Sequence, residues 1–423
     1  MAQNSPVSLW ETTAAESTHG TPLDGDATFD VAIVGGGYTG LSTALHGAEK
    51  GLNCHVLETS HVGFGGSGRN VGLVNAGLWL SPQDVCDHLG TERGTELVKR
   101  LGEMPAYVFD LIEKHDIQCE VTKTGTIHAA HAPSGFENLQ RRAEGWHRLG
   151  APVDLLDADA TTEKTGTTRF HGGLLDQRAG TINPMGYARG LARAALAAGA
   201  RVSTGVTVTG VQQQGDDWHV TTTRGKIRAR NVVIATNAYS DDLWPGLKQT
   251  YTKIHFFQLS TPPLGERAAH ILSERQGLWD TGRIMFSLRR DAFGRLIVGS
   301  MGAIHGGTKG LSRRWANKTL KRLFPELGPV EFDKAWHGQI AMTPDHLFRM
   351  HRLAPGLYSP IGYNGRGITT GTMFGKSIAD LLTGAEESTL PIPLTALRPV
   401  SNRTMKTGFY HTAFAANQLI KCL

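Results

Sequence analysis

The chain is poor in cysteine, has no long apolar run and carries no dense block of either charge. Its four cysteines, at positions 54, 86, 119 and 422, show no Cys-x-x-Cys spacing, so we expect neither a zinc site nor a disulfide framework, but reduced thiols in a cytoplasmic protein. No stretch of about 18 apolar residues occurs, which predicts no membrane span and leaves only peripheral association with a membrane open. The N-terminal stretch is polar and acidic rather than basic and then apolar, so we expect no secretory signal.

Charge and histidine spacing disfavour two further kinds of site. The 43 Lys and Arg residues only slightly outnumber the 38 Asp and Glu residues and form no long basic run, so we expect no nucleic-acid partner. His128 and His131 form a His-x-x-His pair, but on the strand expected there the two rings would point to opposite faces. We therefore expect no metal site.

Glycine, in contrast, is abundant, and its first cluster lies between two apolar segments. Residues 31–34 fit a buried parallel strand, and Gly35, Gly37 and Gly40 follow in a Gly-x-Gly-x-x-Gly spacing. The first glycine permits a tight turn, the second lets backbone approach a pyrophosphate, and the third lets the next helix pack on the strand. Glu58 ends the second apolar segment, where a carboxylate can accept the hydroxyls of an adenosine ribose. This unit predicts a dinucleotide site.

Three later segments extend the predicted site beyond one glycine turn. Residues 63–77 form a second glycine-rich loop, in which Ser67 and Arg69 could add donors to an anion-binding backbone. Residues 231–236 indicate an apolar strand that ends in small polar residues, as the cofactor-facing edge of a parallel sheet requires. Residues 362–375 form a third glycine-rich loop that leads into a helix and offers backbone N–H groups to a cofactor.

The four segments occur in an order that resembles the FAD-dependent D-amino-acid-oxidase-like (DAO) superfamily: VGGGYTGLSTALHGAEKG with a following LE, then GGSGRNVG, VVIATNAY and GYNGRGITTGTMFGKSIAD. Within it, the chain is similar to the branch of γ-glutamylputrescine oxidases and related bacterial amine and imino-acid (pipecolate) oxidases. The resemblance covers most of residues 29–384. It implies an FAD-binding domain assembled from discontinuous segments, with an antiparallel substrate domain inserted between them.

The fold class expected is α/β, or α+β overall. We assign residues 1–28 to an N-terminal arm that Trp10 could anchor by packing, and residues 385–423 to a wrapping tail with little periodicity. The Rossmann-like FAD-binding domain is expected to consist of residues 29–81, 148–245 and 346–384. Residues 82–147 are expected to form a helical excursion over its sheet, and residues 246–345 the antiparallel-sheet substrate domain.

The resemblance also implies which residues hold FAD. They are Gly35, Gly37, Tyr38, Thr39, Gly40, Glu58, Gly66, Ser67, Arg69, Asn70, Gly72, Leu73, Val206, Thr236, Asn237, Gly362, Asn364, Gly365, Gly367 and Ile368. Family members that attach FAD through a histidine in the second glycine loop have that histidine where Asn70 stands. Because no cysteine lies near the last glycine loop either, we expect a non-covalent flavin.

The last glycine loop departs from many relatives, which have GYSGHG where this chain has GYNGRG. The change puts Asn364 and Arg366 near the flavin. Arg366 could hold a substrate carboxylate in a bidentate grip, stabilise the negative charge of reduced flavin, or pair with an acidic side chain. Candidate substrate contacts are Tyr251, His255, Met285 and Arg366. Arg366 and His255 are the candidate catalytic residues, and His255 could equally be a packed strand residue.

The activity implied is oxidation of a C–N bond in a small amine, amino acid or imino acid. Hydride passes to flavin N5, the imine hydrolyses, and O2 reoxidises the flavin and forms H2O2. A flavin dehydrogenase that passes electrons to a quinone or carrier, and a non-catalytic flavin-binding protein, remain alternatives on the sequence. A flavin hydroxylase is disfavoured, because no Gly-Asp pair occurs between residues 357 and 375.

Overall fold

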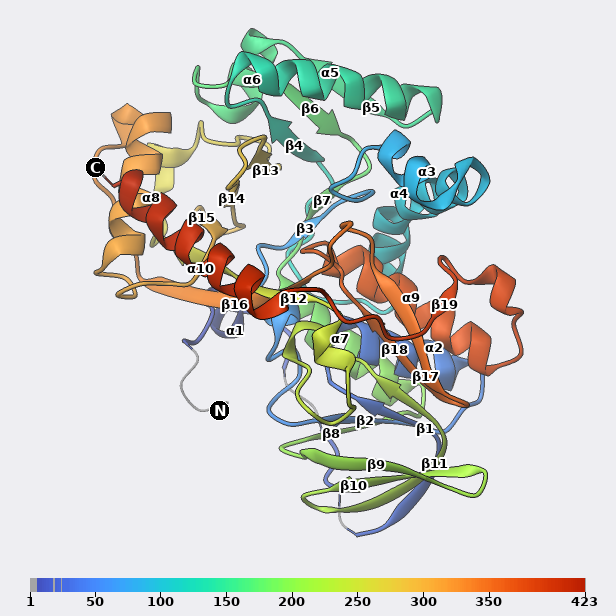
Figure 1. Ribbon diagram of the computed structural model, residues 1–423. Helices are drawn as coiled ribbons and strands as arrows, with labels where there is room; N and C mark the ends of the chain where they lie inside the picture. Colours follow the sequence, from blue (N-terminus) through green and yellow to red (C-terminus); the bar gives the residue numbers. More distant parts are fainter. Residues whose placement is uncertain (1–5, 18–19, 24, 423) are drawn as a thin grey trace.

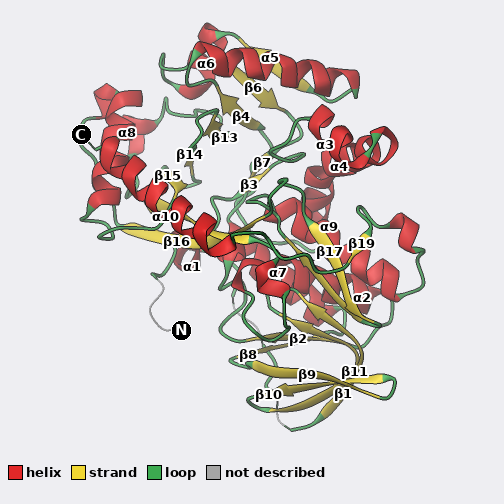
Figure 2. Cartoon of the chain, in the orientation of Figure 1, coloured by secondary structure: helices red, strands yellow, loops and turns green. Residues whose placement is uncertain are grey.

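The computed structural model describes residues 6–17, 20–23 and 25–422 and arranges them in two large sheets with helices packed against them (Figure 1). Figure 2 shows the sheet with β1 and β2 at one end of the molecule and the sheet with β4, β13 and β14 toward the other. The mixed α/β class expected from the sequence is confirmed. No helix in the described part of the chain is long and apolar enough to cross a membrane.

The first sheet holds the glycine unit. Its main strands run in the order β19 (Leu394–Thr395), β17 (Arg349–Ala354), β18 (Leu357–Ile361), β11 (Gly225–Ile234), β1 (Ala27–Val34), β2 (Cys54–Glu58) and β8 (Arg201–Thr204). β9 (Val208–Gln214) and β10 (Asp217–Thr222) continue from β11 as an antiparallel extension. β1 pairs in parallel with both β11 and β2, and Val34 lies opposite Ile234. The carboxyl ends of β1 and β11 therefore emerge side by side, where a parallel sheet binds ligands.

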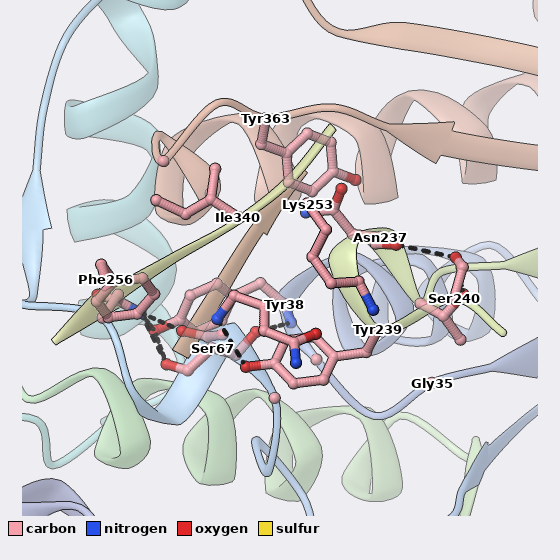
Figure 3. A pocket seen from close by; sticks show the side chains of 18 of the residues that line it. Gly35, Tyr38, Ser67, Asn237, Tyr239, Ser240, Lys253, Phe256, Ile340 and Tyr363 are labelled. Carbon is pink, nitrogen blue, oxygen red and sulfur yellow. Dashed lines mark hydrogen bonds between the residues drawn. The ribbon is translucent and has the colours of Figure 1, made fainter. Parts of the chain in front are cut away.

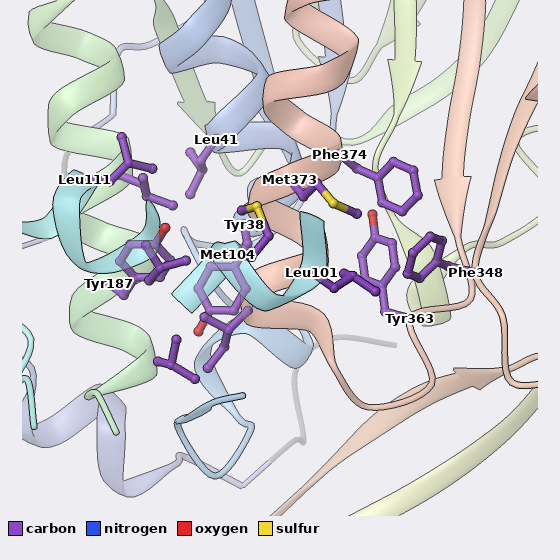
Figure 4. Close-up of a cluster of buried hydrophobic side chains, with 14 of the residues drawn as sticks. Tyr38, Leu41, Leu101, Met104, Leu111, Tyr187, Phe348, Tyr363, Met373 and Phe374 are labelled. Carbon is purple, nitrogen blue, oxygen red and sulfur yellow. The ribbon is translucent and has the colours of Figure 1, made fainter. Parts of the chain in front are cut away.

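Helices α2 (Tyr38–Glu49), α4 (Thr91–Lys114), α7 (Pro184–Ala197) and α9 (Gly367–Leu382) share a hydrophobic core, which Figure 4 shows around Leu41, Met104, Tyr187 and Met373. Close contact of α2 with α9 requires glycine, because a Cβ at Gly375 would lie 2.7 Å from the carbonyl oxygen of Thr39. A Cβ at Gly40 would lie 2.0 Å from the carbonyl oxygen of Gly35, which confirms the packing role predicted for this third glycine.

The second sheet runs in the order β16 (Lys334–Met342), β12 (Thr252–Ser260), β15 (Leu296–Met301), β14 (Phe286–Arg290), β13 (Gly277–Asp280), β4 (Thr126–Ala129), β6 (Gly173–Asp176) and β5 (Val153–Leu156). Its pairs are antiparallel except β13 with β4. Three of these strands come from residues 126–176, outside the 246–345 segment expected to form this sheet. They are four residues long, too short to show a clear alternation. The division into domains stays a prediction.

Short elements link the two sheets. β3 (Leu73–Val74) pairs with β7 (Gly180–Thr181). Further helices are α3 (Pro82–Leu89), α5 (Pro133–Arg148), α6 (Ala158–Thr165) and α8 (Leu311–Leu323). Short single turns also occur, such as η1 (Gly66–Gly68) and η2 (Asn237–Tyr239).

The predicted anchoring of the N-terminal arm is confirmed: Trp10 of α1 (Leu9–Thr13) is fully buried and its Nε1–H donates to the carbonyl oxygen of Asn70 at 2.8 Å.

The C-terminal segment corrects the sequence analysis. Instead of a tail with little regular structure, residues Arg403–Ile420 form the helix α10, which packs against β12 and α8. Its buried residues are Phe414 and Gln418, one turn apart, and Gln418 hydrogen-bonds with Ser312 and the carbonyl oxygen of Ala303. The apolar residues on the rest of the helix point outward, so they show no core-facing period in the sequence.

Candidate active site

A cavity of about 920 Å³ lies between the carboxyl ends of β1 and β11 and the second sheet, at the upper end of the range of ~300–1,000 Å³ usual for ligand pockets. Figure 3 shows Tyr38, Ser67, Asn237 and Tyr363 around it, although they come from four distant parts of the sequence. The predicted site residues that line it are Gly35, Gly37, Tyr38, Thr39, Glu58, Gly66, Ser67, Asn70, Leu73, Thr236, Asn237, Met285, Gly365, Arg366, Gly367 and Ile368.

The first glycine turn and Glu58 form one end of the cavity. Gly35 has a φ of +110°, and a Cβ at Gly37 would lie 2.8 Å from Ser67 Oγ. Glu58 accepts the backbone N–H groups of Gly36 at 2.7 Å and Ser60 at 2.9 Å. Burial raises the pKa of Glu58, while these two N–H groups favour its charged form. The carboxylate is therefore held in a fixed position beside the N-terminus of α2, as dinucleotide binding requires.

Two predicted residues of the second glycine loop serve the loop itself. Asn70 donates through Nδ2 to the carbonyl oxygens of Gly66 and Ser67 and accepts the N–H of Gly72 at 2.8 Å. Arg69 is directed away from the cavity, because its guanidinium donates to the carbonyl oxygens of Phe64 at 2.8 Å and Pro6 at 2.7 Å. The side chain of Arg69 therefore does not line the cavity, and its role in holding FAD stays a prediction.

The last glycine loop is braced in the same way. Asn364, with a φ of +51°, accepts the N–H of Thr343 at 2.8 Å and donates to the carbonyl oxygen of Gly362. Both polar atoms of its side chain are thus hydrogen-bonded to backbone, and Asn364 does not line the cavity. Gly362 in turn donates its N–H to Asn237 at 3.0 Å, and Tyr363 shares a 2.7 Å hydrogen bond with Thr39. These contacts fix the loop against the first sheet and α2.

Arg366, the N-cap of α9, has a different environment. It is buried, and its guanidinium lies 4.4 Å from the ring centroid of Trp79 and 4.7 Å from that of Trp279, two rings that meet edge to face at 4.9 Å. Within the described residues the guanidinium makes no hydrogen bond or ion pair, and Nε is buried without a partner. Burial, together with the nearby Arg142, lowers the pKa of Arg366 to about 9. The acidic pairing considered on the sequence is not observed among these residues.

The aromatic walls around Arg366 are themselves held in place. Trp79 donates its Nε1–H to the carbonyl oxygen of Asn364, and Arg142 donates to the carbonyl oxygen of Trp79. Trp279 stacks on His128 with ring centroids 3.4 Å apart, and burial lowers the pKa of His128 well below its usual value. Arg366 is thus a cation on the cavity wall, beside two rings that have further partners.

Strand β12 reaches the cavity with residues other than the one expected. Lys253, Phe256 and Gln258 of β12 line the cavity, whereas His255 does not and contacts His411 of α10 at 3.3 Å. Burial and the neighbouring histidines lower the pKa of His255 to about 4. The structure therefore places His255 outside the cavity lining, and its catalytic and substrate role stays a prediction.

The other predicted residues that do not line the cavity support its walls. Tyr251 is fully buried in the core of the first sheet, its carbonyl oxygen accepts Arg403 Nε at 2.8 Å, and burial raises its pKa to about 12. Val206 donates its N–H to the carbonyl oxygen of Glu58. A Cβ at Gly72 would lie 2.2 Å from the carbonyl oxygen of Ile182. The full set outside the cavity lining is Gly40, Arg69, Gly72, Val206, Tyr251, His255, Gly362 and Asn364.

Several lining residues were missed by the sequence analysis. They are Trp79 and Trp279, Phe256 and Gln258 of β12, Tyr363, and the α10 residues Arg403, Thr404 and Thr407. The alternation in β12 could have found Phe256 and Gln258, had the cavity-facing register been known. The two tryptophans lie 200 positions apart on loop and sheet segments, and no local pattern links them.

The cavity fits FAD in its own geometry. Its lining includes glycines that leave no room for a Cβ, a fixed carboxylate, and residues at the N-termini of α2 and α9. Both helix ends offer free N–H groups and positive potential to an anionic cofactor. Among the described residues, the cavity lining contains no cysteine or histidine, and no group of three or more His, Cys, Asp and Glu side chains is placed to hold a metal ion.

Comparisons with known proteins point the same way. The family described as "FAD dependent oxidoreductase" (DAO) matches residues 30–381. Gamma-glutamylputrescine oxidoreductase of Escherichia coli (strain K12) is 33% identical over 375 residues, which cover 86% of each chain.

Two solved structures have a similar fold. The crystal structure of glycine oxidase from Geobacillus kaustophilus has a TM-score of 0.73 and 21% identity, covering 87% of this chain and 98% of that one. The structure of L-amino acid deaminase from Proteus myxofaciens in complex with anthranilate has a TM-score of 0.71 and 18% identity, covering 88% and 93%. The fold, the cavity and the family match agree, and the chain belongs to the DAO family of FAD-dependent oxidoreductases.

Proposed function

We propose that the chain oxidises the C–N bond of a small amino acid or imino acid whose carboxylate binds Arg366. The observation that carries the proposal is the buried guanidinium of Arg366, which lies against the rings of Trp79 and Trp279 in the cavity wall without a hydrogen-bond partner among the described residues. A buried charge that lacks a partner is unfavourable, so its position favours an anion as ligand.

A carboxylate suits this position better than other anions of similar size. A guanidinium presents parallel N–H donors that match the two oxygens of a carboxylate, and charged hydrogen bonds of this kind are strong. The rings of Trp79 and Trp279 stabilise the cation by cation–π contact and leave its N–H donors unpaired. The acid that acts electrostatically on Arg366, Asp176, is already held by Arg178 at 2.7 Å and 2.9 Å.

The cofactor is proposed to lie between Glu58 and Arg366, held by the N-terminus of α2 and by Ser67, and to be bound without a covalent link. When bound, FAD supplies the acceptor for the hydride that leaves the substrate carbon. The proposal of a non-covalent cofactor is supported by Asn70, which stands in the second glycine loop with its side chain hydrogen-bonded, and by the absence of cysteine and histidine among the described lining residues. Acid precipitation should release the flavin into the supernatant.

The lining near Arg366 favours a substrate that arrives as the neutral amine. Gln258, Ser287 and Ser300 line the cavity together with the two tryptophans, and none of these side chains titrates near neutral pH. With no base among these side chains to remove a proton, the amine is proposed to lose it in solution. The expected result is a kcat/KM that rises toward alkaline pH, and a value unchanged from about pH 6 to about pH 10 would contradict it.

The name of the Escherichia coli relative suggests one substrate to test beside α-amino acids. A γ-glutamyl amine also has a carboxylate, but it lies many bonds away from the amine that would be oxidised. The chain has 33% identity to that relative, so γ-glutamylputrescine belongs in the panel. Comparing the bleaching by γ-glutamylputrescine with that by α-amino acids then shows whether the carboxylate of the substrate lies far from or next to the reacting carbon.

The direct test is anaerobic bleaching of the flavin absorbance of the purified protein. The panel contains α-amino acids, cyclic imino acids, N-methyl amino acids, γ-glutamylputrescine and, for each, a matched amine without the carboxylate. We expect bleaching by one carboxylate-containing class and little by its matched amine. Bleaching by the amines alone would reject the role of Arg366, and a protein without flavin or without any bleaching would reject the enzymatic proposal.

The electron acceptor is proposed to be O2, with H2O2 as product, in a cytoplasmic protein. This part is tested by measuring H2O2 formed per substrate oxidised under air. One H2O2 per substrate supports an oxidase. Turnover that needs an added quinone or carrier would instead identify a dehydrogenase with the same substrate.

A further inference from the structure

The outer face of α10 is apolar and exposed. Met405 is 67%, Phe409 66%, Leu419 52% and Ile420 67% exposed, although Phe414 and Gln418 on the opposite face are buried against the body. Met405 and Phe409 are one helical turn apart, and Leu419 and Ile420 continue the same side after Thr412 and Ala416. Few large apolar side chains are this exposed in the described chain, and four of them lie on this one helix.

Positive charge is concentrated beside this face. α8 contains five Lys and Arg residues and no acid, and residues 388–423 contain four Lys and Arg residues and no acid. The remaining chain therefore has more Asp and Glu than Lys and Arg, although the whole chain has a formal charge of +5. On α8, the residues Arg314, Lys318, Lys321 and Arg322 are exposed along one side.

The basic side of α8 and the end of α10 lie together. Cys422, just after α10, donates through Sγ to the carbonyl oxygen of Leu311 at 3.6 Å, and Arg314 and Lys318 act electrostatically on its thiol. Arg322 likewise acts on Lys421. Figure 1 shows α10 running along the outside of the molecule toward α8. An apolar helix face bordered by a row of cations is the pattern of a helix that lies in the interface of an anionic membrane.

We propose that α10 and α8 form a docking surface for an anionic lipid membrane. The apolar stripe of α10, formed by Met405, Phe409, Leu419 and Ile420, inserts among the acyl chains near the headgroups, and the cations of α8 contact the acidic headgroups. A second copy of the chain fits this surface poorly, because a two-fold contact through α10 would bring like-charged α8 helices together.

The docking surface is continuous with the cavity. Arg403, Thr404 and Thr407 at the start of α10 line the cavity, while Met405 and Phe409 in the same turns are exposed. Docking would therefore hold this end of the cavity close to the lipid headgroups. This inference concerns the surface alone and holds whichever amine or amino acid is the substrate.

The test is flotation of the full-length holoprotein with vesicles. The vesicles contain either phosphatidylcholine alone or phosphatidylcholine with phosphatidylglycerol, at low and at high salt. We expect binding to the anionic vesicles at low salt, with weaker binding at high salt and on phosphatidylcholine alone. An apolar variant combines Met405→Ser, Phe409→Ser, Leu419→Ser and Ile420→Ser, and a charge variant combines Arg314→Gln, Lys318→Gln and Lys321→Gln.

Each variant has a matched control elsewhere on the surface. Phe293→Ser with Leu155→Ser removes exposed apolar side chains, and Arg224→Gln with Lys226→Gln and Arg230→Gln removes exposed cations from the β10–β11 end of the molecule. The charge variant should weaken binding by about fivefold for each cation removed, the apolar variant should abolish it, and the controls should bind as the wild type does.

Three results would overturn the proposal. The first is that the wild type does not bind anionic vesicles, and the second is that the apolar variant binds them as well as the wild type does. The third is that the wild type is a dimer and the apolar variant a monomer, while both bind vesicles equally. The last result, measured by light scattering, would assign the surface to a second copy of the chain. Flavin content and Tm identify any variant that fails to fold.

Discussion

Two buried arginines of the protein have opposite surroundings. Arg289 of β14 lies beside the second glycine loop, and its Nη1 donates to the carbonyl oxygens of Val71, Gly72 and Ile182. Arg366 has only the faces of two tryptophans and no hydrogen bond among the described residues. The first cation holds backbone in place, whereas the second is left for an anion. Burial alone therefore does not distinguish a structural arginine from a binding arginine, but the state of its donors does.

The largest expected effect is on catalysis. Arg366→Gln should lower kcat/KM for a carboxylate-containing substrate about 100-fold, because the charged hydrogen bonds lost are worth about 2–3 kcal/mol. The matched amine without a carboxylate should change by less than about threefold. Steady-state kinetics on both substrates measure the difference. Lys253→Gln, which removes another cation from the cavity lining, is the control, and an equal loss for both substrates would remove the distinction between the two arginines.

Stability should respond in the opposite sense at the two arginines. Arg289→Met leaves three carbonyl oxygens without their donor and should lower the free energy of unfolding by about 3 kcal/mol. Arg366→Met removes a cation that has no partner in the folded protein, so stability should stay equal or rise by about 1 kcal/mol. Thermal and urea unfolding of both variants measures this. If Arg366→Met were the more destabilised of the two, Arg366 would be a structural residue.

A smaller effect is expected at the other end of the cavity. Glu58→Gln keeps the shape of the side chain and loses the charge that accepts the N–H groups of Gly36 and Ser60. FAD affinity should fall about tenfold, since one charged hydrogen bond is worth about 1.5 kcal/mol more than a neutral one. Fluorescence of released flavin on dilution measures the dissociation constant. An unchanged constant would mean that Glu58 only braces the turn.

The smallest effect is expected at His255. The variant His255→Gln should keep kcat/KM within about twofold of the wild type, because the ring lies outside the cavity. Its folded-state pKa of about 4 lies below the usual 6.5, so the unfolded chain takes up the proton first as pH falls. This group therefore lowers stability progressively from about pH 6.5 down to about pH 4. Tm measured across this range should fall less in the variant, and a loss of activity near neutral pH would restore His255 as a candidate.

The sequence predicted the dinucleotide end of the site because its determinants are local. Gly35, Gly37 and Glu58 lie in one strand–turn–helix–strand unit, and the turn, the packing and the carboxylate follow from their spacing. The strand at 231–236 and the last glycine loop were located for the same reason.

The substrate end was predicted less well because it depends on distant contacts. Arg366 was singled out from its loop, but the pair of Trp79 and Trp279 beside it comes from two distant segments that meet only in the folded chain. His255 was chosen in place of Phe256 and Gln258 because a strand pattern does not say which face meets the cavity. α10 was missed because its exposed apolar residues conceal a buried stripe of only two residues.

The binding of a carboxylate that cannot be oxidised tests the role of Arg366 most directly. Benzoate added to the holoprotein should change the flavin absorbance in a saturable way, and the dissociation constant should rise about 100-fold in Arg366→Gln while the flavin stays bound. Equal benzoate affinity in the two proteins, or no spectral change in the wild type, would contradict the assignment of Arg366 as the carboxylate anchor.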